Sequence, residues 1–261
     1  MNFPRSHSEA PSAGESTRRL DPALPGVRKR LHALLLYHLR MGGRVLDLQG
    51  GYRATDEFLA KSGFSVLSMD TNRKRIAQAR ERTRSVQAPV GHVCMSMREL
   101  NAFRDNSFNA IVADLGTLNH VQNLRPVFKQ FSRLLRDNGT LFLPMMNRFS
   151  VAETLAYIRR GRLKDAWRRW VTAGEGVPFV SQEALVWFHP LRELKRLAKG
   201  RFTIQHVMGI NILTPTPSFR EQYDKHPHII SFAHGIERAI DSYPFISLLG
   251  GYFVVVLEKF E

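Results

Sequence analysis

Short apolar segments alternate with amphipathic ones from Arg44 to Met146, and this alternation limits the folds open to the chain. The apolar segments have the length of buried strands and read RVLDL, FSVLSMD, VGHVCM, SFNAIVAD and TLFLPMM. Helices are predicted between them, for example over TDEFLAKSG, NRKRIAQARERTR and LRPVFKQFSRLLRDNG, the last ending at Gly139. Strands and helices of these lengths are typical of right-handed crossovers. The sequence therefore predicts a mostly parallel sheet covered by helices on both faces.

Further elements flank this alternation. Residues 27–40, VRKRLHALLLYHLR, predict an amphipathic helix, whereas the polar composition of residues 1–22 predicts a disordered tail. Residues 150–199 predict a helical insertion, followed by a strand, a helix and a final strand over RFTIQHVMGI, PHIISFAHGIERAIDSY and GGYFVVVLEKF. We therefore expect one α/β domain over residues 23–261, doubly wound with seven strands. The insertion is expected to form a helical cap over the ligand cleft.

The chain has a formal net charge of +15 at pH 7. Such a balance favours nucleic acid, anionic lipid or an acidic substrate as partner. The densest basic cluster is residues 158–170, IRRGRLKDAWRRW, which predict a helix with arginines beside an apolar stripe. The arginines are Arg159, Arg162 and Arg169, and the stripe is Leu163, Ala166 and Trp170. Two interpretations stay open: a solvated amphipathic helix, or a basic helix that faces an anionic membrane or a protein partner.

Several classes of protein are excluded by simple counts. No apolar run reaches the roughly 18 residues of a membrane-spanning helix, and the polar N-terminus lacks the apolar segment of a signal peptide. The single cysteine, Cys94, excludes an intramolecular disulfide and any multi-cysteine metal site, and no metal is expected. We expect its thiol to be buried beside strand residues. These features predict a soluble, cytoplasmic protein.

A carboxylate ends each of the first two predicted strands. Asp47 ends the first, and the turn after it contains two glycines and leads into a helix. Glycines let the backbone approach a ligand, and a helix N-terminus offers free N–H groups. Asp70 ends the second strand, 70 − 47 = 23 residues later, a spacing that suits a hydrogen bond to a ribose hydroxyl. These features predict a nucleotide cofactor and leave NAD, FAD and S-adenosylmethionine open.

Two longer stretches narrow this choice. Residues 44–82, RVLDLQGGYRATDEFLAKSGFSVLSMDTNRKRIAQARER, resemble motifs I and II of class I S-adenosylmethionine-dependent methyltransferases, where Asp-x-Gly-x-Gly-x-Gly follows the first strand. Residues 103–149 are similar to the later segment of these enzymes, and FHPLRELKRLA and GGYFVVVLEK to a bacterial subgroup with a helical insertion. The resemblance implies a Rossmann-like fold, S-adenosylmethionine as cofactor and methyl transfer to a small-molecule or lipid-like acceptor held under the cap.

The resemblance also implies roles for single residues. In the cofactor loop, Asp47 would lie near the methionine amino group, with Gln49, Gly50 and Gly51 beside the cofactor. Asp70 would bind the ribose hydroxyls. The residues around the adenine would be Thr71, Met97 and Arg98, and those facing the methionine end and the acceptor would be Asp114, Leu115 and Gly116.

Three further residues are candidates for contact with the acceptor. Asn119 lies at the predicted lip of the cleft and is a candidate substrate contact. An oxygen or nitrogen acceptor can require a base, and His120 and His189 are the candidates for that role.

The cofactor loop departs from the family pattern at two glycines, which are Gln49 and Arg53 here, and Met97 stands where an acidic residue is usual. If Gln49 must take a positive φ, its side chain costs on the order of 1–2 kcal/mol, which weakens cofactor binding roughly tenfold. Arg53 either obstructs the site or pairs with the methionine carboxylate. An active methyltransferase and a non-catalytic binding protein of the same fold therefore both stay open. An RNA methyltransferase is the weakest alternative, because the sequence shows no basic-aromatic interleaving.

Overall fold

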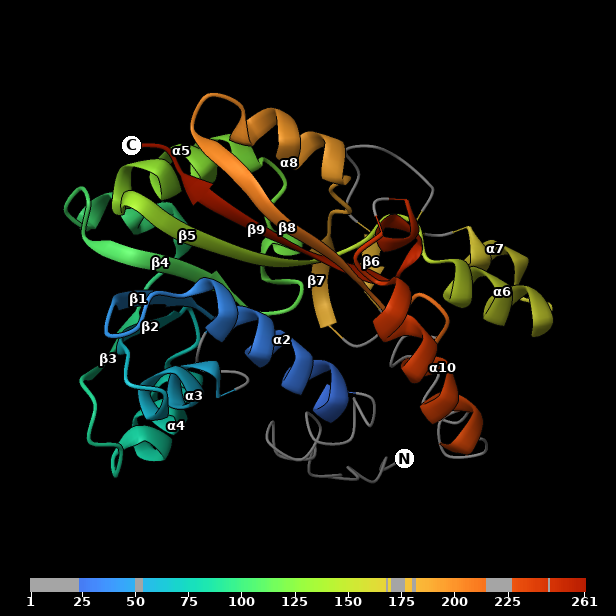
Figure 1. Ribbon diagram of the computed structural model, residues 1–261, viewed down its shortest axis with the longest axis horizontal. Helices are drawn as coiled ribbons and strands as arrows, with labels where there is room; N and C mark the ends of the chain where they lie inside the picture. Colours follow the sequence, from blue (N-terminus) through green and yellow to red (C-terminus); the bar gives the residue numbers. More distant parts are fainter. Residues whose placement is uncertain are drawn as a thin grey trace, which may run out of the picture.

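Seven strands of the described chain form one sheet in the order β3-β2-β1-β4-β5-β9-β8 (Figure 1). The structure is a computed structural model and describes residues 24–49, 54–167, 169, 177–179, 182–214, 227–243 and 245–261. The predicted disordered tail lies outside these residues. The strands are β1 (Arg44–Leu48), β2 (Ser65–Asp70), β3 (Val90–Cys94), β4 (Phe108–Ala113), β5 (Leu135–Met146), β8 (Phe202–Ile210) and β9 (Tyr252–Lys259).

Strand direction confirms the mostly parallel, doubly wound α/β sheet. The pairs β2–β3, β1–β2, β1–β4 and β4–β5 are parallel, whereas β9 runs antiparallel between β5 and β8. Alternate residues of β9 belong to opposite layers of the core: Val255 and Leu257 to one, Val254 and Val256 to the other. All four side chains are fully buried, which explains why this strand reads as a continuous apolar run.

Helices cover both faces of the sheet (Figure 1). On one face, α2 (Leu24–His38) and α3 (Thr55–Lys61) contribute Leu35 and Leu59 to the core, and α4 (Arg73–Thr83) packs beside α3 and β3. On the other face, α5 (Leu124–Leu134) and α8 (Leu191–Ala198) contribute Phe131 and Leu194. Helix α10 (Pro227–Ile240) lies between β8 and β9 in the chain.

The helix predicted to run to Gly139 ends five residues earlier. Leu135 already has an extended conformation and pairs with Phe108 of β4. The N–H groups of Asn106 and Ser107 donate to the last helical carbonyls, those of Arg133 and Leu134, at 3.0 and 2.9 Å. Pairing with the neighbouring strand therefore outweighs helix propensity over this segment.

The predicted helical cap over residues 150–199 is not confirmed. The segment contains α6 (Val151–Arg159), α7 (Leu163–Ala166), an antiparallel pair of strands, β6 (Val177–Phe179) and β7 (Gln182–Val186), and then α8. Helix α8 packs against α5 in the layer that covers the sheet and is not part of a cap. The sequence around residues 172–182 signals a break but carries too little alternation to predict two strands.

The single basic helix predicted over residues 158–170 is also wrong. Helix α6 ends at Arg159. Gly161 then adopts φ 68°, a left-handed conformation that glycine adopts readily and that commonly follows the end of a helix. Arg169, predicted on an exposed basic side, is only 4% exposed. Its guanidinium donates from Nε and Nη2 to the carboxylate of Glu153 at 3.1 and 2.5 Å, and from Nη1 to the carbonyl of Asn147 at 2.9 Å. Arg169 therefore ties α6 to the end of β5.

Two further expectations concerned the burial of Cys94 and the length of the helices. Cys94 is exposed, not buried, because it ends β3, which lies at the edge of the sheet. None of the helices in the described ranges is both long and apolar enough to cross a membrane.

Candidate functional site

Three carboxylates lie near one another at the carboxyl ends of β1, β2 and β4, because these strands are parallel neighbours. Asp47 is the penultimate residue of β1, Asp70 ends β2, and Asp114 directly follows β4. Asp47 is fully buried, and neither of its carboxylate oxygens has a hydrogen-bond partner among the described residues. Burial raises the pKa of Asp47 well above its usual range, and the negative charges of Asp56 and Asp114 raise it further. A cation bound here would remove this electrostatic cost.

This buried carboxyl makes stability depend on pH, and the sign follows from the direction of the shift. The pKa of Asp47 is raised above 3.8, so its contribution to stability is present at low pH and is lost as the pH rises through the folded-state pKa. Replacing Asp47 with Asn removes that loss. We expect Asp47→Asn to become progressively more stable relative to the wild type as the pH rises above 3.8.

Urea denaturation at a series of pH values measures this difference. Glu81→Gln is the matched control, because the Glu81 side chain is 77% exposed and its replacement should show no such trend. A difference between Asp47→Asn and the wild type that stays constant with pH would contradict the assignment.

Gln49, at the first altered glycine position, adopts φ 67°, so the condition under which its side chain strains the backbone is met. Its N–H donates to the carbonyl of Met69 at 2.7 Å. Its side-chain Oε1 accepts a hydrogen bond from the hydroxyl of Thr117 at 3.1 Å, which ties the loop to the segment after β4. This bond offsets part of the backbone strain, since a net hydrogen bond is worth about 1 kcal/mol. Gly50, Gly51 and Arg53 lie outside the described residues.

Two substitutions separate the strain at Gln49 from its hydrogen bond. Both Gln49→Ala and Gln49→Gly lose the bond to Thr117, but only glycine relieves the left-handed backbone. We therefore expect Gln49→Ala to be less stable than Gln49→Gly by about 1 kcal/mol, the reverse of the usual order. Guanidinium denaturation of the two variants tests this, and an alanine variant as stable as the glycine variant would be inconsistent with the positive φ.

The far end of the cofactor loop is held by a buried network that the sequence did not reveal. Asp56, in the first turn of α3, is fully buried. Its carboxylate accepts a hydrogen bond from Nη2 of Arg82 at 3.2 Å and lies 3.3 Å from Nε2 of His92. Burial lowers the pKa of His92, and Asp56 opposes this shift. The network joins α3 to α4 and β3, so it fixes where the loop re-enters the fold.

The residues predicted to contact ribose and adenine lie at the carboxyl end of β2 and shortly after β3. One oxygen of Asp70 accepts the N–H of Asn72 at 2.8 Å, while the other has no hydrogen-bond partner among the described residues and lies 3.8 Å from Nη1 of Arg75. Met97 begins a 3-10 helix, η1 (Met97–Ala102), and is half-buried. Thr71 and Arg98, the other two expected adenine neighbours, are exposed.

Of the three predicted site residues after β4, one can face a ligand and two have structural roles. Asp114 is half-buried, and its Oδ1 accepts the N–H of Leu115 at 2.7 Å, whereas the Leu115 side chain packs into the core on the α2 side. Gly116 adopts φ 80°, and a Cβ there would lie 3.1 Å from the methyl group of Met146. Gly116 is thus required by the turn, and Asp114 is the residue of this segment that can face a ligand.

Asn119, the predicted substrate contact, has a different role. Its side chain is fully buried. Its Nδ2 donates to the carbonyls of Met146 and Trp187 at 3.2 and 2.8 Å, and its Oδ1 accepts the N–H of Met146 at 2.7 Å. The amide is occupied by backbone partners, so Asn119 positions the end of β5 against the chain that follows β7.

The two histidines suggested as bases also differ. His189 is 5% exposed, with Nε2 lying 2.8 Å from the carbonyl of Val121 and Nδ1 lying 3.0 Å from a carboxylate oxygen of Glu193. Both ring nitrogens are engaged by acceptors of the protein, so neither is open to an acceptor substrate. His120 is half-buried at the end of the 3-10 helix η2 (Thr117–His120).

A small hollow, whose empty volume of about 390 Å³ includes open solvent, lies between α2 and the ends of β4 and β5. Its polar lining consists of Arg28, His32, Thr55 and Asp114, and its apolar lining includes Leu31, Leu35, Val112, Phe142 and Pro144. His32 stacks on Phe58 with ring centroids 3.7 Å apart. Burial, and to a lesser extent the charge of Arg28, lowers the pKa of His32 to about 4, so its imidazole is neutral at physiological pH. The sequence showed only an amphipathic helix here.

Comparison with known proteins identifies a family that matches part of the chain. Residues 46–143 match the family described as methyltransferase domain. The ubiquinone biosynthesis O-methyltransferase of Xanthomonas campestris pv. campestris (strain B100) is 30% identical over 141 residues, which cover 51% of this chain and 59% of that protein. The chain spans about half the length of the curated relatives it matches.

Solved structures share the fold over most of the chain. A SAM-dependent methyltransferase from Methanosarcina mazei has a TM-score of 0.58 at 19% identity and covers 87% of this chain and 97% of that chain. The [4+2]-cyclase SpnF has a TM-score of 0.58 at 18% identity, with coverages of 88% and 81%. The family match shows a methyltransferase domain over residues 46–143, the solved structures share its fold, and S-adenosylmethionine is the cofactor that this family implies.

Proposed function

We propose that this protein transfers a methyl group from S-adenosylmethionine to a small-molecule or lipid-like acceptor that enters the pocket beside α2. The observation that carries the proposal is the buried carboxylate of Asp47, whose two oxygens have no hydrogen-bond partner among the described residues. An orphaned buried charge is costly in a folded protein. S-adenosylmethionine carries an ammonium and a sulfonium, and either cation would offset the negative charges of Asp47 and Asp114.

The residues present fit the cofactor at both of its ends. The oxygen of Asp70 that lacks a hydrogen-bond partner can accept from a ribose hydroxyl, as the spacing from Asp47 predicts. Asp114 lies beside the pocket, where it can pair with a cation. S-adenosylmethionine supplies an already activated methyl group, so the protein mainly has to align the acceptor with it. Alignment can contribute about 7–11 kcal/mol toward the barrier.

The α2 pocket supports an apolar acceptor with one polar group. Aliphatic side chains and Phe142 line it together with Asp114. The neutral imidazole of His32, which also lines the pocket, can accept a hydrogen bond from a hydroxyl group and orient its oxygen. With a pKa of about 4, His32 is a weak base, so we assign it an orienting role.

A methyl-transfer assay tests this proposal. The protein is incubated with S-adenosylmethionine labelled in its methyl group and with an organic extract of bacterial metabolites. We expect label in the organic phase, and none with Asp70→Ala. Binding of S-adenosylmethionine without any transfer to the extract, to a polar metabolite pool or to RNA would argue against an enzyme of this class.

A second candidate is a protein that keeps the fold without transferring methyl groups. Two observations favour it: Gln49 holds a strained position that family members fill with glycine, and the fold is shared with a [4+2]-cyclase. Titration of Gln49→Gly with S-adenosylmethionine separates the candidates. Binding at least tenfold tighter than in the wild type would show that the loop has drifted from function, whereas weaker binding would show that Gln49 supports the site.

An RNA methyltransferase is a third and weaker candidate, because the net charge of +15 alone favours it. Phosphate contacts make affinity fall steeply with salt. A weak RNA affinity, or one that is unchanged between 50 and 200 mM salt, would eliminate this candidate.

A further inference from the structure

Helix α10 has a charged residue on its inner side and apolar residues on its outer side, the opposite of a helix that packs on a core. Its inward residue Glu237 is 1% exposed and accepts hydrogen bonds from the N–H groups of Leu213 and Thr214 at 2.7 and 2.9 Å. Its outward side carries a stripe of apolar side chains at spacings of three and four residues: Ile229, Phe232 and Ile236, which are 65%, 71% and 40% exposed. A soluble protein normally buries such a stripe.

Helix α6 repeats the same arrangement. Its inward residue Glu153 is 2% exposed and pairs with Arg169. Its outward stripe is Val151, Leu155 and Ile158, which are 42%, 54% and 40% exposed. In the following α7 segment, Leu163 and Trp167 are also exposed. Two helices thus place a carboxylate inside and apolar side chains outside, which indicates that the outer surface has an apolar partner.

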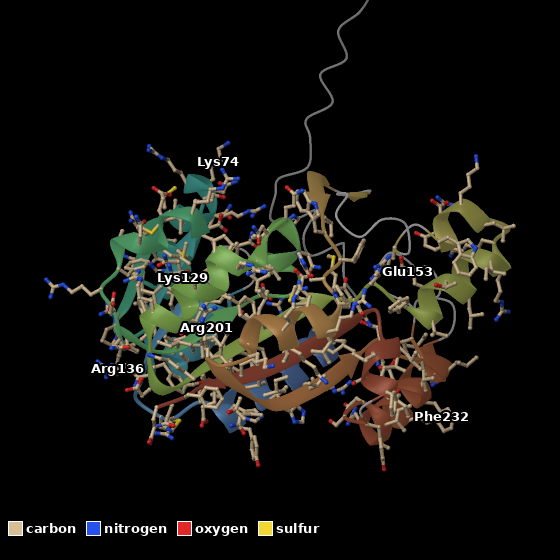
Figure 2. All side chains as sticks on the ribbon, turned by 90° about the horizontal axis from the view of Figure 1, so that it is seen from above. Lys74, Lys129, Arg136, Glu153, Arg201 and Phe232 are labelled. Carbon is tan, nitrogen blue, oxygen red and sulfur yellow. The ribbon has the colours of Figure 1, made fainter. Side chains whose placement is uncertain are left out.

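Both helices lie at the same end of the molecule, and we call their exposed surface the α6–α10 end (Figures 1 and 2). Figure 2 shows Phe232 at this end and Lys129 and Arg136 at the opposite one.

The charges around α6 and α7 favour one kind of partner. Four exposed basic residues follow the α6 stripe: Arg159, Arg160, Arg162 and Lys164. The only acids of residues 149–167 are Glu153, which is buried, and Asp165, which pairs with Arg162 at 2.6 Å. This net positive rim would repel the same rim of a second copy in a symmetric dimer. It is complementary to the headgroups of an anionic bilayer, into which Leu, Ile, Phe and Trp side chains insert.

We propose that the α6–α10 end binds the surface of anionic phospholipid membranes. Apolar side chains of both helices enter the interface, and the basic rim of α6 and α7 contacts the headgroups. Attachment is peripheral, since none of the described helices has the length and apolarity to span a bilayer. The proposal does not depend on methyl transfer, although a protein attached in this way could reach a lipid-like acceptor.

Vesicle flotation tests the proposal on the full chain. With vesicles of equal parts phosphatidylcholine and phosphatidylglycerol, we expect partitioning at least tenfold stronger than with phosphatidylcholine alone. The double variant Leu155→Ser/Phe232→Ser should lose at least tenfold of this partitioning, because both side chains are exposed and their loss removes only interfacial contacts. The matched control is Tyr37→Ser/Met41→Ser, whose side chains are 83% and 72% exposed on and just after α2, and it should bind like the wild type.

A second test compares two double variants that each remove two positive charges. Arg159→Gln/Arg160→Gln should weaken binding to the anionic vesicles, whereas Lys129→Gln/Arg136→Gln, at the opposite end, should weaken it much less. Thermal unfolding followed by circular dichroism verifies that every variant is folded. Equal binding to neutral and anionic vesicles, or equal losses in test and control variants, would overturn the proposal. So would a dimer in light scattering that Leu155→Ser/Phe232→Ser dissociates, because a second copy would then cover this surface.

Discussion

Arg169→Ala is expected to lower the free energy of unfolding by about 3–5 kcal/mol. The substitution leaves the Glu153 carboxylate buried without its cation and removes the donors to the carbonyls of Asn147 and Gly251. An unpaired buried charge is among the largest single penalties in a folded protein. Urea denaturation followed by circular dichroism measures the change.

Two further variants show whether the loss comes from the buried pair. Arg159→Ala removes an exposed arginine ten residues earlier, and we expect a change within about 0.5 kcal/mol. Glu153→Gln/Arg169→Met removes both charges and should recover part of the stability lost in Arg169→Ala. A cost for Arg169→Ala no larger than for Arg159→Ala would refute the buried ion pair between α6 and the end of β5.

Asp70→Ala is expected to weaken S-adenosylmethionine binding about 10- to 100-fold, or about 1.5–3 kcal/mol. This is the range of a hydrogen bond to a charged acceptor. Calorimetric titration measures the affinity. Methylthioadenosine, which keeps the ribose and lacks the amino acid, should lose affinity by a similar factor, because the contact is assigned to the ribose.

The controls separate this contact from a structural effect of Asp70. One oxygen of Asp70 accepts the N–H of Asn72, which caps α4, so Asp70→Asn keeps an acceptor for that N–H while it loses the charge. Its binding should be weakened, with unfolding close to that of the wild type. Asp137→Ala, an exposed aspartate, should bind normally. Unchanged affinity in Asp70→Ala would mean that the ribose lies elsewhere.

The sheet and the carboxylates at its edge were predictable because they depend on local patterns. Strand length and alternation give a parallel sheet, and the ends of parallel strands meet at one edge, which places Asp47, Asp70 and Asp114 together. The left-handed conformation of Gln49 was also foreseeable, since the family has glycine at that position. These inferences need no knowledge of contacts between distant residues.

The side-chain roles that the sequence missed depend on such contacts. Asn119 is occupied by backbone groups of Met146 and Trp187, which lie 27 and 68 residues away in the chain. His189 contacts Val121, again 68 residues away. No pattern of a single sequence encodes these partners, so polar residues beside the cleft were assigned to ligands.

Competing local signals explain the errors in the insertion and around α5. Residues 158–170 have the composition of an amphipathic helix, but Gly161 ends it and Arg169 pairs with Glu153, a buried residue that the pattern treats as solvated. Leu135 has good helix propensity, yet it pairs with Phe108 in the sheet. In both places tertiary contacts outweigh intrinsic propensity.

Calorimetric titration of the wild-type protein with S-adenosylmethionine is the most direct test of the central conclusion, that this edge of the sheet is a working cofactor site. We expect a saturable heat with one site per chain and an affinity that falls in Asp70→Ala. We also expect weaker binding by Asp47→Asn, although that variant is more stable without ligand. No heat and no thermal shift at millimolar S-adenosylmethionine or S-adenosylhomocysteine would contradict this conclusion.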